Sequence, residues 1–186
     1  MQSNSPAEGL SDAVTAMATP VVTTPASPIR AYIGIGANLG DAQATVEQAF
    51  AWLDALPSTR VTERSWLFRT APIDAGGDDY VNAVAAIDTS LCAADLLQAL
   101  QTIETDHGRL RPYPNAPRTL DLDILLYGQQ KMQTPHLTIP HPRLTQRAFA
   151  LIPLLQIAPM IAIPGHGPAH AFTPDVATQT IRRVVV

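Results

Sequence analysis

Apolar and acidic residues alternate along a short stretch in the second half of the chain. Leu120, Leu122 and Ile124 alternate there with Asp121 and Asp123. An alternation of period two is typical of a β-strand with one buried face. We therefore expect the three apolar side chains to face a core and the two aspartates to share the opposite face. Along a strand that rises about 3.3 Å per residue, the two aspartates would lie about 6.6 Å apart.

Two helices and three more strands are predicted from the spacing of apolar residues elsewhere. Apolar residues recur at helical spacing in two segments and predict helices over residues 41–56 and 96–107. Asp41 is the expected N-cap of the first helix, and Pro57 is expected to stop it. Runs of strand-forming residues predict strands over residues 31–36, 59–70 and 80–90.

The predicted order of elements is strand, helix, strand, strand, helix, strand. This is the ferredoxin-like βαββαβ unit, in which both helices cover one face of an antiparallel sheet. The other face would then be open for a site. We predict an α+β fold with this sheet, helices packed on it, and a C-terminal extension. In the extension, residues 148–155 are expected to form a short helix and a turn around Pro153, whereas residues 175–186 fit either a helix or a strand.

The first 29 residues differ in composition from the rest of the chain. They are rich in Ala, Thr, Ser and Pro, and no Lys or Arg precedes Arg30. We expect residues 1–29 to be a disordered tail and residues 30–186 to form one domain.

No apolar run approaches the ~20 residues of a membrane span. Cys92 is the only cysteine, which excludes an intrachain disulfide and fits a reducing compartment, so a cytoplasmic protein is expected.

Charge is distributed unevenly along the chain. The formal net charge is -4, which disfavours non-specific binding to nucleic acid. Six of the 12 Lys and Arg residues nevertheless fall between positions 109 and 147. They are Arg109, Arg111, Arg118, Lys131, Arg143 and Arg147. A basic band in an acidic protein fits a small anionic ligand better than a nucleic acid.

The paired aspartates have two interpretations. Most Asp-x-Asp pairs on strands form a solvated face that binds nothing. Asp121 and Asp123, however, lie within the basic band, and His141 follows between two prolines. Nearby carboxylates repel each other unless a cation lies between them, and Mg²⁺ prefers carboxylate oxygens and substrate phosphates. Since guanidinium groups pair with phosphate, the set as a whole favours a metal-bound polyphosphate.

Two other patterns carry possible chemistry. Gly34, Gly36 and Gly40 do not have the spacing of a dinucleotide-binding loop, and no Walker lysine follows them. We interpret Gly34 and Gly36 as part of the strand over residues 31–36, and Gly40 as part of a tight turn from that strand into the helix. Tyr80 and Asn82 would share one face of their strand. An aromatic ring beside an amide suits a flat heterocycle, through stacking and edge hydrogen bonds, although an aromatic on a sheet surface is commonly only structural.

Five blocks of sequence together carry a family resemblance. They are residues 31–41, 80–82, 108–111, 117–124 and 139–143. In sequence and in order they resemble the 6-hydroxymethyl-7,8-dihydropterin pyrophosphokinases of folate biosynthesis, with the specific string P-R-T-L-D-L-D-I at 117–124. The resemblance extends over about residues 31–172. It implies transfer of the diphosphate of ATP to the hydroxymethyl group of the pterin, which gives AMP and the pterin diphosphate, with two Mg²⁺ ions accompanying ATP.

The resemblance also implies roles for individual residues. Asp121 and Asp123 match the magnesium ligands. The matched catalytic arginines are Arg109, Arg111 and Arg118. The positions matched to ATP binding are Gln101, Glu104, Arg118, Ile124, Thr138, His141 and Arg147. The positions matched to pterin binding are Thr70, Pro72, Tyr80, Asn82 and Phe149.

Two alternatives from other functional classes stay open at this point. A Mg²⁺-dependent nucleotidyltransferase could also use a strand-borne aspartate pair, but it would release pyrophosphate. A non-catalytic nucleotide-binding module would bind without turnover. In either case we expect a monomer whose partners are small molecules, with neither nucleic acid nor membrane among them. Fold alone does not decide between these functions.

Overall fold

The computed structural model describes residues 27–72, 78–107 and 119–185. The strands are β1 (Ile29–Ala37), β2 (Thr59–Arg64), β3 (Phe68–Thr70), β4 (Tyr80–Thr89), β5 (Asp121–Tyr127), β6 (Met132–Gln133), β7 (Thr138–Ile139), β8 (Ala162–Ile163), β9 (Gly167–Pro168) and β10 (Ile181–Arg183). The α-helices are α1 (Ala42–Asp54), α2 (Ala93–Asp106) and α3 (Ala148–Ile157). Of the predicted tail, residues 1–26 lie outside the described residues.

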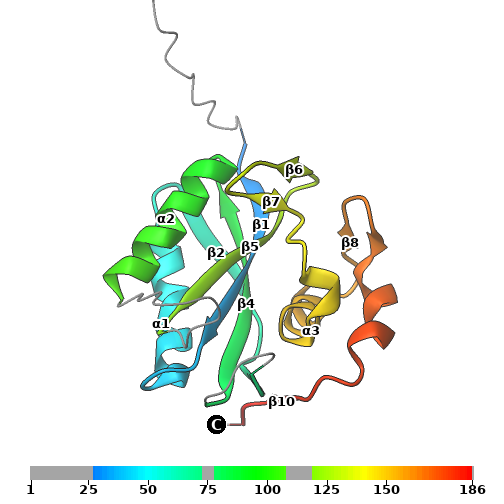
Figure 1. Ribbon diagram of the computed structural model, residues 1–186. Coiled ribbons are helices and arrows are strands. Elements are labelled where there is room, and N and C mark those ends of the chain that lie inside the picture. The colour runs from blue at the N-terminus through cyan, green and yellow to red at the C-terminus, as the bar shows by residue number, and fades with distance from the viewer. Residues whose placement is uncertain (1–26, 73–77, 108–118, 186) are drawn as a thin grey trace, which may run out of the picture.

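An antiparallel sheet forms the centre of the molecule (Figure 1). Its strands run in the order β10-β3-β4-β1-β5, and β2 pairs with β4 next to β3. Helices α1 and α2 cover one face, while α3 and the C-terminal elements lie on the other (Figure 1). The predicted α+β, ferredoxin-like fold is therefore confirmed. None of the helices in residues 27–72, 78–107 and 119–185 combines the length and apolar composition needed to cross a bilayer.

Helix α1 follows the pattern that predicted it. The Asp41 side chain accepts a hydrogen bond from the Ala44 amide at 3.0 Å, which confirms the predicted N-cap. Gly40, just before it, has a φ of 61°, a left-handed conformation that glycine adopts without a Cβ clash. The buried stripe of the helix faces the sheet and consists of Val46, Ala49, Phe50 and Leu53.

The period-two assignments of β4 and β5 are confirmed. Leu120, Leu122 and Ile124 belong to the core between the sheet and helices α1 and α2. The predicted inward side chains of β4, Val81, Ala83, Ala85 and Ile87, belong to the same core. Asp121, Asp123 and Asn82 therefore emerge on the opposite face, because successive side chains of a strand alternate between faces.

The predicted strand over residues 59–70 was wrong in one respect, because it is two strands. At Ser65, between β2 and β3, the regular pairing with β4 is interrupted. The Ser65 amide donates to the Val84 carbonyl at 2.9 Å, and its hydroxyl accepts from the Val84 amide at 2.8 Å. A shift of register between Val61 and Glu63 also bends β2 before this point. Both strands still pair with β4, so the topology is unchanged.

The second face of the sheet is partly covered by the C-terminal extension. A second core lies there, in which Val84 and Leu125 of the sheet meet Leu151 and Leu154 of α3. The prediction of a turn at Pro153 was wrong, since α3 continues through it to Ile157. Proline removes one backbone donor, and burial of this almost wholly apolar helix against the sheet offsets that loss. The ambiguous C-terminal stretch forms a 3₁₀ turn at Pro174–Val176 and then strand β10.

Candidate active site

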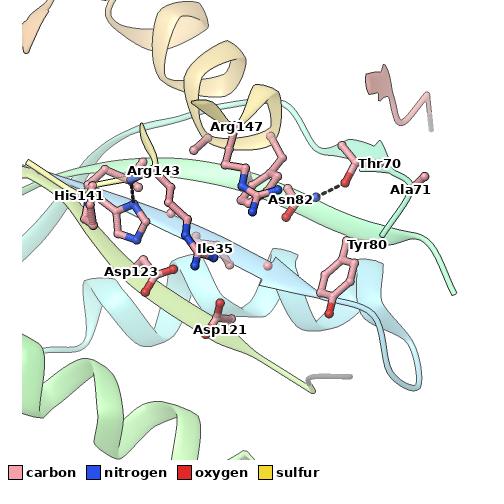
Figure 2. Close-up of a pocket in the computed structure, with 17 residues that line it drawn as sticks. Ile35, Thr70, Ala71, Tyr80, Asn82, Asp121, Asp123, His141, Arg143 and Arg147 are labelled. Atoms are coloured by element: carbon pink, nitrogen blue, oxygen red, sulfur yellow. Dashed lines mark hydrogen bonds between the residues drawn. The ribbon is translucent and has the colours of Figure 1, made fainter. Parts of the chain in front are cut away.

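A pocket of about 440 Å³ opens on the α3 side of the sheet, beside the area that α3 covers. Strands β1, β4 and β5 form its floor, and the segment that leads into α3 forms one wall (Figure 2). Eight of the residues predicted as site residues line it. They are Thr70, Tyr80, Asn82, Asp121, Asp123, His141, Arg147 and Phe149. The fold thus brings together residues that lie up to 79 positions apart in the chain (149 minus 70).

The two aspartates lie at one side of this floor. Asp121 is half-buried and Asp123 is exposed, and both line the pocket from β5 (Figure 2). The pairing register places Asp121 opposite Gly36 and Asp123 opposite Gly34 of β1. Directly paired residues of an antiparallel sheet project to the same face. The carboxylates therefore stand beside two positions that carry no side chain.

Gly34 and Gly36 lie within β1, which confirms the predicted strand over residues 31–36, and Gly40 lies in the turn before α1. Gly36 pairs with Asn82 on one side and with Asp121 on the other. A Cβ on Gly36 would lie 3.1 Å from Asn82 Oδ1, which is tighter than ordinary van der Waals contact. We call the Gly34 and Gly36 positions the glycine gap. The gap separates the amide of β4 from the carboxylates of β5.

The side of the floor opposite the aspartates carries a fixed amide. Asn82 Nδ2 donates to Thr70 Oγ1 at 2.9 Å, and both side chains are buried (Figure 2). This bond leaves Asn82 Oδ1 as an acceptor on the pocket side, next to the glycine gap. Tyr80 and Phe149 line the same pocket from β4 and α3. An amide of fixed orientation in a pocket that two aromatic side chains also line can recognise a flat polar heterocycle.

The wall before α3 supplies the positive charge of the pocket. His141, Arg143 and Arg147 all line it (Figure 2). The Arg143 amide donates to His141 Nδ1 at 3.2 Å, so the proton of a neutral imidazole is on Nε2. Burial and then the Arg143 charge lower the pKa of His141, while Asp121 acts in the opposite direction. At neutral pH the imidazole is therefore an uncharged donor near the Arg143 guanidinium.

Some predicted site residues lie away from this pocket. Gln101 is exposed on α2, Ile124 points into the helix-side core, and Thr138 is on β7. Glu104 is buried, and its Oε1 accepts the Leu122 amide at 2.8 Å, so it contacts β5 between the two aspartates. Pro72 is described by the structure but is not among the lining residues. Arg109, Arg111 and Arg118 lie outside the described residues.

Other lining residues were not predicted as site residues. Arg143 is the main one, and its place in the basic band was the signal for it. Gly34 and Gly36 also line the pocket, but their contribution depends on a partner in a distant strand. The local sequence therefore carries no direct sign of their role.

The donor set fits a divalent cation that arrives with a phosphate ligand. No group of three or more His, Cys, Asp or Glu side chains that could hold a metal occurs in the part of the chain that the structure describes. Asp121 and Asp123 instead offer carboxylate oxygens alone, beside arginines that suit phosphate. Mg²⁺ commonly binds in this way, with few protein ligands and the rest of its coordination shell from water and substrate phosphates.

Comparison with known proteins agrees with this geometry. Residues 32–159 match the family described as 7,8-dihydro-6-hydroxymethylpterin-pyrophosphokinase (HPPK). The chain belongs to the HPPK family. It is 43% identical over 136 residues to the 2-amino-4-hydroxy-6-hydroxymethyldihydropteridine pyrophosphokinase of Pseudomonas aeruginosa, over 73% of this chain and 84% of that HPPK. To the enzyme of the same name from Bacillus subtilis it is 39% identical over 134 residues, which cover 70% and 79% of the two chains.

Solved structures support the fold. The crystal structure of Plasmodium falciparum HPPK-DHPS A437G with pteroate superposes with a TM-score of 0.68 at 12% sequence identity. The match covers 90% of this chain and 49% of that one, so this chain spans about half the length of the HPPK-DHPS protein. At this identity the likeness bears on the fold alone.

Proposed function

We propose that the chain catalyses the reaction of the HPPK family, transfer of diphosphate from ATP to 6-hydroxymethyl-7,8-dihydropterin, as a step of folate biosynthesis. The products are AMP and the pterin diphosphate. The observation that carries the proposal is one pocket, lined by a fixed amide and two aromatic side chains, in which the amide faces a carboxylate pair across the glycine gap. A heterocycle and a metal-bound polyphosphate can occupy such a pocket side by side.

In this proposal the pterin lies on the Asn82 side. The Asn82 amide, fixed by Thr70, pairs with polar edge atoms of the pterin ring. Tyr80 and Phe149 pack against its two faces. Because β4 and β5 are separated only by β1, Asn82 and Asp121 are about 10 Å apart across the sheet. That span accommodates the hydroxymethyl group and the phosphate it attacks.

The triphosphate of ATP would lie on the Asp121 and Asp123 side. Magnesium, when bound there with ATP, neutralises phosphate charge and draws electron density from the phosphorus that is attacked. Arg143 and Arg147 pair with phosphate oxygens, and His141 Nε2–H donates to another. These groups hold the polyphosphate in one orientation and stabilise the charge that develops on it.

The transfer itself needs positioning more than a strong base. The hydroxymethyl oxygen of the pterin forms a bond to the β-phosphorus of ATP. The bond from that phosphorus to the oxygen bridging the α- and β-phosphates breaks, AMP leaves, and the hydroxyl proton is released. Residues on the two sides of the glycine gap bring the reacting atoms together. The absence of a Walker lysine is consistent with this division of labour.

Further assignments stay predictions. ATP contacts are proposed for Gln101, Glu104, Arg118, Ile124 and Thr138, a pterin contact for Pro72, and catalytic roles for Arg109, Arg111 and Arg118. The contact between Glu104 and β5 also gives that side chain a part in holding the aspartate strand. We likewise predict the use of two Mg²⁺ ions, a monomeric state, no nucleic-acid partner and a cytoplasmic location. The division into a tail (residues 1–29) and one domain is also a prediction.

Product analysis by phosphorus NMR tests the reaction. Purified protein is mixed with ATP, Mg²⁺ and 6-hydroxymethyl-7,8-dihydropterin, and the expected products are AMP and a new diphosphate ester. Release of pyrophosphate would indicate nucleotidyl transfer instead. Unchanged ATP would indicate a binding module. As a check on the pterin side, Asn82→Ala should weaken pterin binding more than ATP binding, and equal losses in titration calorimetry would contradict that assignment.

A further inference from the structure

The C-terminal segment after residue 159 lies beyond the part of the chain that matches the family, yet it contacts the start of α3 and strand β3, which ends at Thr70. We propose that Gln179 and strand β10 are positioning elements for the reaction, Gln179 for Arg147 and β10 for Asn82. This inference rests on the proposed function. It assigns a task to a segment that the family match leaves out.

Gln179 holds the backbone on both sides of Arg147. Its Oε1 accepts the Ala148 amide at 2.9 Å, and its Nε2 donates to the Gln146 carbonyl at 2.7 Å. Ala148 is the first residue of α3, and the N-cap residue Arg147 makes no side-chain cap. The first amides of a helix have no partner within it. Gln179 therefore caps α3 from a position 31 residues away in the chain.

This double contact fixes the segment from which Arg147 reaches the pocket. Gln146 and Ala148 flank Arg147, and a single planar amide joins them. The Arg147 backbone is consequently held at both ends, and its side chain lines the pocket. Without Gln179, Arg147 would still line the pocket, but the backbone that sets the direction of its side chain would be less constrained.

Strand β10 acts on the Asn82 side of the pocket floor. It pairs with β3 so that Ile181 lies opposite Thr70, the residue whose hydroxyl accepts the Asn82 amide. The pairing continues past the strand, where the Val184 amide donates to the Leu67 carbonyl at 2.8 Å. The guanidinium of Arg183 lies 3.5 Å from the centre of the Trp66 ring, a cation–π contact at the far end of β3.

Without β10, β3 would be a three-residue edge strand held to the sheet by β4. A short edge strand frays readily, and Thr70 is its last residue. Strand β10 thus keeps the Thr70 hydroxyl in place, and through it the orientation of the Asn82 amide. Five consecutive residues, 179–183, control one group on the phosphate side and one on the pterin side.

Two pairs of variants separate these effects. Gln179→Ala is compared with Thr178→Ala, whose exposed side chain precedes it. Arg182→Pro removes the central amide of β10, whereas Arg182→Ala removes the side chain and keeps that amide. Gln179→Ala should raise the KM for ATP about tenfold and leave the KM for the pterin within about twofold. Arg182→Pro should do the reverse, and both controls should behave as wild type.

Hydrogen exchange provides a readout that is independent of turnover. In Gln179→Ala the Ala148 amide should exchange faster, and in Arg182→Pro the amides of residues 68–70 should do so. If the wild-type protein makes no pterin diphosphate, the proposed function is refuted. The exchange data would still decide whether Gln179 holds the backbone around Arg147 and whether β10 holds β3. Should Gln179→Ala fail to fold, Gln179→Glu keeps the acceptor for Ala148 and should keep its protection.

Two outcomes would overturn the proposal. One is unchanged KM values for both substrates in Gln179→Ala and Arg182→Pro. The other is an equal rise of both KM values in each variant together with a lower Tm, because a merely structural role predicts a uniform loss.

Discussion

Substitution of Gly36 by alanine should weaken pterin binding selectively. Gly36 lies between Asn82 and Asp121 on the pocket floor, and its Cβ would meet Asn82 Oδ1 at 3.1 Å. Ordinary contacts begin near 3.4 Å, so the amide has to move by a few tenths of an ångström. Gly36 is not among the described residues with positive φ, and alanine fits its strand conformation. The effect is therefore steric.

The magnitude follows from how firmly the amide is held. Asn82 is 4% exposed and bonded to Thr70, so it cannot move away without lengthening that hydrogen bond or displacing β4. Misalignment of an amide that makes one or two hydrogen bonds to the pterin should cost about 1–1.5 kcal/mol of binding. This corresponds to about a tenfold increase in the Kd for the pterin. The affinity for ATP should change by less than about threefold, because the methyl group does not reach the arginines.

Titration calorimetry with the pterin, in the presence of a non-hydrolysable ATP analogue and Mg²⁺, measures the effect. Gly34→Ala is the matched control, since it adds the same methyl group two residues earlier on β1. Its Cβ would lie 3.3 Å from Leu125 Cδ2, the end of an apolar side chain that can adjust. Its pterin affinity should stay within about twofold of wild type. Equal affinities in the two variants, or a larger loss in Gly34→Ala, would refute the steric reasoning.

Three further predictions address the metal side, a helix cap and a buried hydroxyl. Asp123→Asn should lower the rate of AMP release by at least about a hundredfold over a Mg²⁺ titration, and a near-normal rate would refute its role as a metal ligand. Asp41→Ala should lower the free energy of unfolding in urea by about 1 kcal/mol, because the Ala44 amide loses its cap; an unchanged midpoint would contradict this. Burial, and then the nearby Cys92, raises the pKa of Tyr127, whose hydroxyl donates to the Leu91 carbonyl at 2.7 Å. The corresponding stability is present below pH ~10 and is lost as pH rises through the folded-state pKa, so Tyr127→Phe should show a smaller loss of Tm above pH ~10 than wild type.

The sheet and its faces could be predicted because their signals are local. A strand register that slips by one residue exchanges the two faces, so the alternation of Leu120 and Leu122 with Asp121 and Asp123 left one arrangement. The same holds for Asn82 on β4. The order of elements then determined the fold. These patterns depend on neighbours two or four positions away and can be read from one sequence.

The features that sequence reasoning missed depend on distant partners. The break at Ser65 exists because its hydroxyl and amide pair with Val84. The continuation of α3 through Pro153 depends on its burial against the sheet. Gly36 was predicted within a strand, but the need for glycine there was not, because the residue that requires it, Asn82, is 46 positions away (82 minus 36). Each cause is a tertiary contact that no local pattern records.

The glycine gap has a consequence for which acceptors the enzyme can use. The amide is on β4 and the carboxylates are on β5, with β1 between these strands. Their separation is therefore set by two spacings between neighbouring strands of the sheet. Side-chain substitution alters the shape of either half of the pocket but not this distance. The distance between the heterocycle and the hydroxyl of an acceptor alcohol must therefore match a spacing that the backbone of the sheet fixes. A heterocycle whose hydroxyl is one carbon nearer or farther should bind at Asn82 and still fail to react.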